Sequence, residues 1–206
     1  MHGVTTLFWD VGGVILSNAW DQEERRAAFK QFGLDEDSFE KRHAKFFTLL
    51  EIGGISLDEY LKQTVFYVPR TFTPEDFKAF MFAQSSENHT TRALLDEITA
   101  AGRYLMATLN NESAELNAYR IREFQLKRNF TVFLTSCYLG VRKPDAAIYQ
   151  RALDITQRAP EECIFIDDRA PNIEAARRLG IRTILFENPA QLAKELMQEG
   201  VLGAAA

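Results

Sequence analysis

The sequence predicts an α/β protein, with a Rossmann-like parallel sheet as its core and a small α-helical cap domain. Two observations predict this fold class. Short apolar segments alternate with helix-length segments after residue 87, a pattern typical of a parallel sheet with helical crossovers. Another apolar segment opens the chain, and an aromatic-rich stretch with helical periodicity separates it from the others. We therefore expect residues 1–16 and 87–206 to form the core domain and residues 17–86 the cap domain.

The composition is that of an ordinary globular protein. Of the 206 residues, 46% are hydrophobic and 26% are charged, which excludes the compositions of disordered and fibrous chains. The formal net charge is −5 and the chain has no long basic stretch, which argues against nucleic acid as a partner. A small molecule is the expected partner, and the sequence indicates no oligomeric state.

The cysteines and the apolar segments predict the compartment. Cys137 and Cys163 are each expected inside or beside an apolar strand, which favours reduced thiols over a disulfide. The chain shows no signal-peptide pattern, and no apolar stretch reaches the ~20 residues that span a bilayer. We expect a cytoplasmic protein without a membrane partner.

The first predicted strand, Thr5 to Val11, is rich in β-branched and aromatic residues and is stopped by Gly12-Gly13. Asp10 therefore lies at its carboxyl end. An aspartate on a sharp turn after a buried strand can present a carboxylate for in-line attack. Asp and Gly are also default turn residues, so this motif alone does not decide between a nucleophile and a turn.

The predicted cap domain is expected to contain several helices. Helical periodicity breaks at Gly33, at Gly53-Gly54 and around Pro69. Ser56 and Thr73 are plausible N-caps, and Ser56 with Glu59 forms a predicted capping box. The many aromatic side chains supply enough apolar area to pack these helices together.

The rest of the core is predicted to hold four more strands. They are expected at Tyr104–Leu109, Phe130–Leu134, Cys163–Asp167 and Thr183–Phe186, with helices between them. Ligands of such sheets bind beyond the carboxyl ends of the strands. Polar residues at those ends are therefore the candidate site residues.

Two further loops carry charged residues at such positions. Lys143 precedes Pro144 and a helix start, where an ammonium can neutralise a phosphoryl group, although most lysines are solvated surface residues. Asp167 and Asp168 end an apolar strand. Adjacent carboxylates repel each other unless a cation holds them, and Mg²⁺ prefers one or two protein carboxylates completed by water and phosphate oxygens.

These three loops, in this order, resemble the haloacid dehalogenase superfamily over nearly the whole chain. The resemblance implies an α/β core with a helical cap inserted after the first strand. It places Asp10 on the family nucleophile and Lys143 on the charge-neutralising lysine. Asp168 falls on the metal-binding aspartate, with Asp167 and Asn172 supporting it. Trp20, with Asn18, is expected to line the pocket below the cap.

The sequence departs from the family pattern after Asp10. Family phosphatases usually carry a second aspartate two residues after the nucleophile as the general acid and base, and here that residue is Gly12. The Gly12 carbonyl is still expected to bind magnesium. This Asp-x-Gly-Gly-Val motif is similar to that of sugar-1-phosphate phosphatases and of the phosphatase-like domain of epoxide hydrolases. Restoring Asp at position 12 is expected to raise turnover of poor leaving groups.

A second departure concerns phosphate binding. Counting along the chain puts Leu109 at the usual Ser/Thr position, so Asn110, beside Asn111, is the favoured phosphate ligand and Thr108 the second choice. Thr108 is equally interpretable as a β-branched strand residue. The histidines His2, His43 and His89 do not cluster, and none is a predicted ligand.

The resemblance implies a Mg²⁺-dependent phosphatase that hydrolyses a small-molecule phosphate monoester, similar to a sugar phosphate, through an aspartyl-phosphate. One alternative is a 2-haloacid dehalogenase, which uses an Asp nucleophile on this fold without a metal. The other is a non-catalytic domain that binds phosphate and metal. Metal dependence separates the first two, and turnover separates both from the third.

Overall fold

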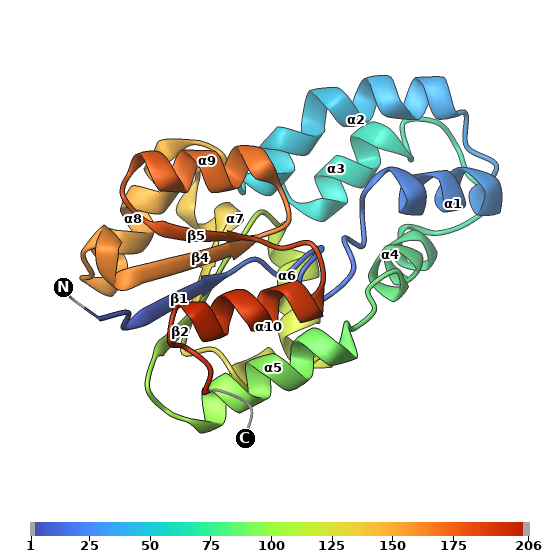
Figure 1. Ribbon diagram of the computed structural model, residues 1–206. Coiled ribbons are helices and arrows are strands. Elements are labelled where there is room, and N and C mark those ends of the chain that lie inside the picture. The colour runs from blue at the N-terminus through green and yellow to red at the C-terminus, as the bar shows by residue number, and fades with distance from the viewer. Residues whose placement is uncertain (1–2, 204–206) are drawn as a thin grey trace.

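The computed structural model describes residues 3–203, so residues 1–2 and 204–206 of the predicted core domain, His2 among them, lie outside it. A five-stranded parallel sheet with the order β3-β2-β1-β4-β5 forms the centre of the molecule (Figure 1). The strands are β1 Thr6–Trp9, β2 Leu105–Asn110, β3 Val132–Thr135, β4 Cys163–Asp167 and β5 Arg182–Leu185. The predicted fold class is confirmed.

The strand bounds show how local the sequence signal is. The strand at Cys163–Asp167 is predicted with its observed bounds, whereas the other four differ by one or two residues at each end. Cys163 begins β4 as expected, whereas Cys137 lies in the one-turn helix α7 that directly follows β3. Both cysteines are free thiols.

Helices cover both faces of the sheet. Side chains of β1 alternate between the faces, with Leu7 and Trp9 in one apolar cluster and Phe8 in the other. The Leu7 face packs against α5 His89–Ala100 and α10 Pro189–Gln198. The Phe8 face packs against α8 Ala146–Thr156 and α9 Ala170–Arg178 (Figure 1). The other elements of this part of the chain are α6 Ala114–Glu123, the one-turn helix α7 Ser136–Leu139, and the 3-10 turns η1 Leu126–Arg128 and η2 Pro160–Glu162.

The remaining helices form a separate layer beside the carboxyl ends of the strands (Figure 1). They are α1 Gln22–Phe32, α2 Glu36–Glu51, α3 Leu57–Thr64 and α4 Pro74–Ala83. An apolar cluster of their own, rich in aromatic rings, holds them together. We call α1–α4 the cap helices; the predicted domain boundaries at residues 16 and 86 stay predictions.

The starts and ends of the cap helices follow local rules. Gly33 ends α1 in the left-handed conformation (φ 61°), which glycine adopts without strain. Ser56 accepts a hydrogen bond from the Glu59 amide, but the Glu59 side chain contacts Gln63 instead of returning to Ser56. The predicted capping box is therefore half formed, whereas Thr73 forms a complete one at the start of α4.

Within residues 3–203, none of the helices combines the length and the apolar character needed to cross a membrane.

Candidate active site

The sheet brings three predicted site residues together at one edge. Asp10 follows β1 directly, and Asp167 ends the neighbouring strand β4. Lys143 reaches the same point from the loop before α8: its Nζ lies 2.9 Å from Asp10 Oδ1 and 2.6 Å from Asp167 Oδ2. These loops lie far apart in the sequence and meet because parallel strands end together.

Lys143 is buried almost completely, with 1% of its side chain exposed. Burial alone would lower the pKa of its ammonium, but attraction from Asp10 and Asp167 outweighs the burial and raises that pKa. Asn111 fixes the Lys143 backbone from both sides: Oδ1 accepts from its N–H at 2.8 Å and Nδ2 donates to its carbonyl at 2.9 Å. The lysine is thus a positioned positive charge at the bottom of the site.

Asp167 is held in place by hydrogen bonds to both of its oxygens. The Asn172 side chain donates to Oδ1 and Oδ2 at 2.9 and 3.0 Å, and the Arg169 amide donates to Oδ1 at 2.8 Å. Lys143 contacts Oδ2. Because its oxygens are already engaged, Asp167 is placed to orient Lys143, and its expected part in metal binding stays a prediction.

Asp10 combines a fixed oxygen with an unusual electrostatic environment. The Val11 amide donates to Oδ1 at 2.8 Å, the oxygen that also contacts Lys143. Burial raises the pKa of Asp10 to about 7, with Asp167 and Asp168 adding to the rise and Lys143 opposing it. Three carboxylates share one ammonium here, so the site holds an excess of negative charge.

That excess fits a divalent cation. Asp10, Asp167 and Asp168 each offer an oxygen within 4.8 Å of the others. Asp168 Oδ1 is buried and has no hydrogen-bond partner among the described residues, a costly state for a carboxylate oxygen unless a ligand completes it. Gly13 lies against Asp168 with φ 77°, and a Cβ at this position would overlap the Asp168 carboxylate. Asp10 and Asp168 are therefore the side chains that suit a hard cation such as Mg²⁺.

A cavity of about 540 Å³ opens above these groups and is lined by both the core and the cap helices. Asp10, Gly12, Lys143 and Asn111 line its floor, and Asn18 and Trp20, the two residues predicted to line the pocket, form part of its wall.

Two predicted phosphate ligands lie outside the cavity lining. Asn110 Oδ1 accepts from Thr135 Oγ1 at 3.2 Å, and its Nδ2 lies 3.5 Å from Asn117 Oδ1. Thr108 Oγ1 is buried in the sheet without a partner among the described residues. Their assignment to phosphate binding stays a prediction, and Asn111 is the nearby amide that does line the cavity.

Comparison with known proteins identifies the family. Residues 4–180 match the model of the haloacid dehalogenase-like hydrolases. The chain belongs to this family. The resemblance expected from the three loops is thereby confirmed.

This haloacid dehalogenase-like hydrolase is similar to enzymes named for phosphate substrates. It is 32% identical over 150 residues to flavin mononucleotide hydrolase 1 of Arabidopsis thaliana, covering 72% of this chain and 60% of that enzyme's length. It is 28% identical over 213 residues to a D-ribitol-5-phosphate phosphatase of Bacteroides thetaiotaomicron, covering 94% and 97% of the two chains. A family enzyme of the same bacterium, solved with magnesium and inorganic phosphate, has the same fold, with TM-score 0.75, 21% identity and coverage of 90% and 95%.

Several charged residues of this hydrolase line the cavity without having been predicted from the sequence. Glu51, at the end of α2, pairs with Arg142 at 2.8 Å, and Glu112 pairs with Arg120 at 3.2 Å. Neither pair has a local sequence signal, because its members come from segments that meet only in the folded chain. His43 also lines the cavity, and its signal was available: Phe39, His43 and Phe47 share one face of a helix.

Proposed function

We propose that this hydrolase is a magnesium-dependent phosphatase that acts on a small-molecule phosphate monoester through an aspartyl-phosphate on Asp10. The observation that carries the proposal is the pairing of Asp10 with the buried Lys143 at the floor of one cavity. An Asp168 oxygen within 4.8 Å of Asp10 has no partner among the described residues. A nucleophile, a fixed cation and a carboxylate oxygen available to a metal ion are what phosphoryl transfer requires.

The residues of the chain divide the work of the reaction. One Asp10 oxygen is fixed by the Val11 amide, which leaves the other to attack phosphorus as the bond to the leaving oxygen breaks. Lys143 neutralises charge on the transferring phosphoryl group. Water then attacks phosphorus of the aspartyl-phosphate and releases inorganic phosphate. A magnesium ion held by Asp10, Asp168 and the Gly12 carbonyl would supply the remaining positive charge.

Protonation of the leaving group needs separate consideration, because Gly12 has no side chain that could act as a general acid. We expect leaving groups that need little protonation, such as those of anomeric sugar phosphates, acyl phosphates and aryl phosphates, to react fastest. The names of the two relatives point to phosphate on a ribityl hydroxyl, a poorer leaving group. A substrate panel must therefore include both kinds.

The test is release of inorganic phosphate from phenyl phosphate, a sugar 1-phosphate and ribitol 5-phosphate, with magnesium and with EDTA. We expect release that requires magnesium and falls at least about a thousandfold in Asp10→Asn. Asp37→Asn, which changes an exposed aspartate of α2, is the matched control and should keep full activity.

The same assay distinguishes the alternatives. Halide release from 2-chloropropionate that persists in EDTA would support a dehalogenase in place of a phosphatase. The cluster of three carboxylates favours the metal-dependent reaction. Phosphate binding without release from any substrate would support the non-catalytic alternative.

A further inference from the structure

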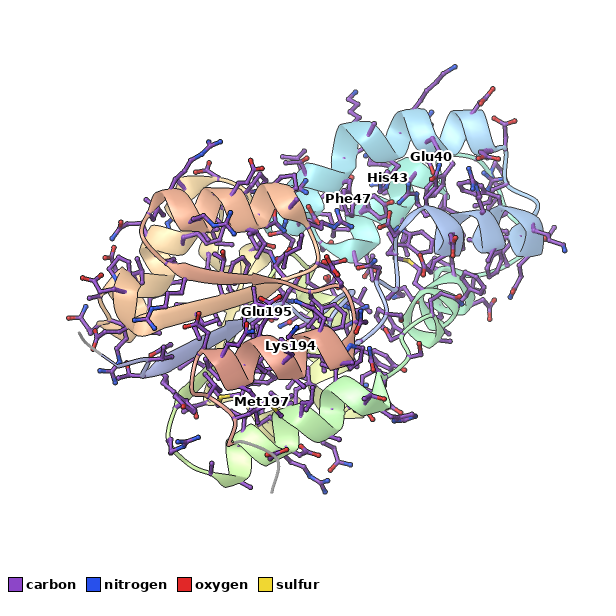
Figure 2. The ribbon with its side chains drawn as sticks, viewed as in Figure 1. Glu40, His43, Phe47, Lys194, Glu195 and Met197 are labelled. Carbon is purple, nitrogen blue, oxygen red and sulfur yellow. The ribbon has the colours of Figure 1, made fainter. Side chains whose placement is uncertain are left out.

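His43 is a buried histidine in the cavity wall opposite the acidic floor. It lies on α2 one turn before Phe47, and Figure 2 shows the two side chains following each other along that helix. The His43 ring packs against the Phe47 ring with centroids 4.4 Å apart and stacks on Phe39 at 6.0 Å. Only 8% of the residue is exposed, and it lines the cavity that holds Asp10.

Two hydrogen bonds fix which His43 nitrogen carries the proton. Trp20 Nε1, which can only donate, lies 3.2 Å from the Tyr60 hydroxyl. That hydroxyl lies 2.7 Å from His43 Nδ1. Tyr60 is fully buried, so its own hydrogen needs an acceptor, and Nδ1 is the acceptor within reach. The proton of a neutral His43 therefore resides on Nε2.

His43 Nε2 is available to a ligand. Among the described residues, this nitrogen has no hydrogen-bond partner. It is also not completely buried, since it is absent from the fully buried polar atoms that lack a partner. Burial lowers the pKa of His43 to about 4, and Arg25 beside it adds to this effect. The ring is consequently neutral at ordinary pH, carries its proton on Nε2, and belongs to a residue that lines the cavity.

The charged residues around the cavity are matched. Each arginine in its lining is paired with a carboxylate at 2.8 to 3.3 Å. The pairs are Arg25–Glu40, Arg120–Glu112, Arg142–Glu51 and Arg169–Asp21. Among the described residues that line the cavity, Lys143 is the only lysine, and it lies at the floor beside Asp10. Among the described lining residues, the cap side therefore offers no unpaired cation to a second phosphate or carboxylate.

We propose that the cap side of the cavity binds an uncharged, hydroxylated leaving group, and that His43 is the specificity-determining residue that donates Nε2–H to one of its oxygens. This inference rests on the proposed phosphatase function and specifies its substrate class: a monophosphate of a polyol or sugar. The Phe47 ring, which packs against His43 and also lines the cavity, provides an apolar surface for the carbon chain, and the single donor provides the polar contact.

Two substrates that differ in the leaving group test the proposal. Ribitol 5-phosphate carries hydroxyls that can accept from His43, whereas phenyl phosphate carries none beyond the scissile oxygen. His43→Phe keeps a ring and removes the donor. His43→Gln keeps an N–H close to the Nε2 position. His89→Gln, an exposed histidine at the start of α5, is the matched control.

We expect His43→Phe to lower the ratio of kcat/KM for ribitol 5-phosphate to kcat/KM for phenyl phosphate about tenfold, mainly through KM. His43→Gln should stay within about threefold of the unmodified ratio, and the control should not change it. An equal effect on both substrates, or no effect on either, would overturn the proposal. It would show that His43 serves only to pack the cap helices.

A second measurement does not depend on substitution of His43. In ¹⁵N NMR spectra of Asp10→Asn, His43 should be the Nε2–H tautomer, and its Nε2 resonance should shift when ribitol 5-phosphate binds but not with phenyl phosphate. The opposite tautomer would overturn the inference. Turnover of phenyl phosphate without turnover of any polyol or sugar phosphate would overturn this inference alone. Absence of turnover with every phosphate would overturn the proposed function and this inference together.

Discussion

The Asp10–Lys143–Asp167 arrangement shows what single residues contribute to the site. A buried lysine costs several kcal/mol unless it is paired, and here two carboxylates compensate it. Asn172 and Asn111 then fix Asp167 and the Lys143 backbone. The positive charge therefore stays in one place while substrate charge arrives, which is the electrostatic preorganisation that phosphoryl transfer uses.

Gly13 gives a sharp test of the cation site. Gly13→Ala would place a methyl group on the Asp168 carboxylate, whereas Gly33→Ala adds one in open space. Both glycines have positive φ, 77° and 61°, so the two variants carry similar backbone strain of about 1 kcal/mol. We expect Gly13→Ala alone to raise the magnesium concentration for half-maximal activity by about tenfold or more. Equal magnesium dependence in both variants would show that Asp168 does not bind the ion.

Gly12 gives a second test, and here the structure changes the expectation from the sequence. A Cβ at position 12 would lie 3.2 Å from Asn18 Oδ1 and 3.5 Å from an Arg120 nitrogen. The guanidinium would keep a carboxyl group introduced at this position ionised, and a carboxylate is a poor general acid. In steady-state assays we now expect Gly12→Asp to raise turnover of ribitol 5-phosphate by less than about threefold. A gain of about a hundredfold would restore the original expectation.

At the scale of elements, the sequence predicted what local patterns encode. The β4 strand, the end of α1 at Gly33 and the N-cap at Thr73 depend on neighbouring residues and were found as predicted. The Trp20–Tyr60–His43 hydrogen bonds join residues from three segments, so no local pattern reveals them. For the same reason the motif at Asp10 could be recognised in the sequence, whereas the ion pairs that line the cavity could not.

The end of α2 yields a pH-dependent prediction. Burial raises the pKa of Glu51 from 4.5 to about 7, and its ion pair with Arg142 opposes the rise without cancelling it. The folded protein therefore binds this proton more tightly than the unfolded chain, so the stability that Glu51 contributes is full below pH 4.5 and is lost as pH rises through 7.

Relative to Glu51→Gln, the free energy of unfolding of the unmodified protein should fall by about 2–3 kcal/mol between pH 4.5 and pH 7. Urea denaturation of both proteins at several pH values, in EDTA, measures this difference. Parallel curves across that range would show that the Glu51 pKa is not raised.

At the scale of the whole molecule, hydrogen bonds at opposite ends of the cavity help to attach the cap helices to the core. Arg120 of α6 donates to the Ser17 carbonyl at 2.7 Å and lies 3.2 Å from Ser85 Oγ, so it holds both connections to the cap. At the other end of the cavity, Ser136 donates to the Glu51 carbonyl at 2.6 Å. The cavity is thus bounded on two sides, with the reacting groups on the core and the neutral histidine donor on the cap.

The covalent step on Asp10 is the central claim, and rapid acid quenching during turnover of phenyl phosphate tests it most directly. Peptide mass mapping of the quenched protein should find one added phosphoryl group on the peptide that contains Asp10, and none in Asp10→Asn. Turnover with no phosphorylated peptide, or with the group on another residue, would contradict the account.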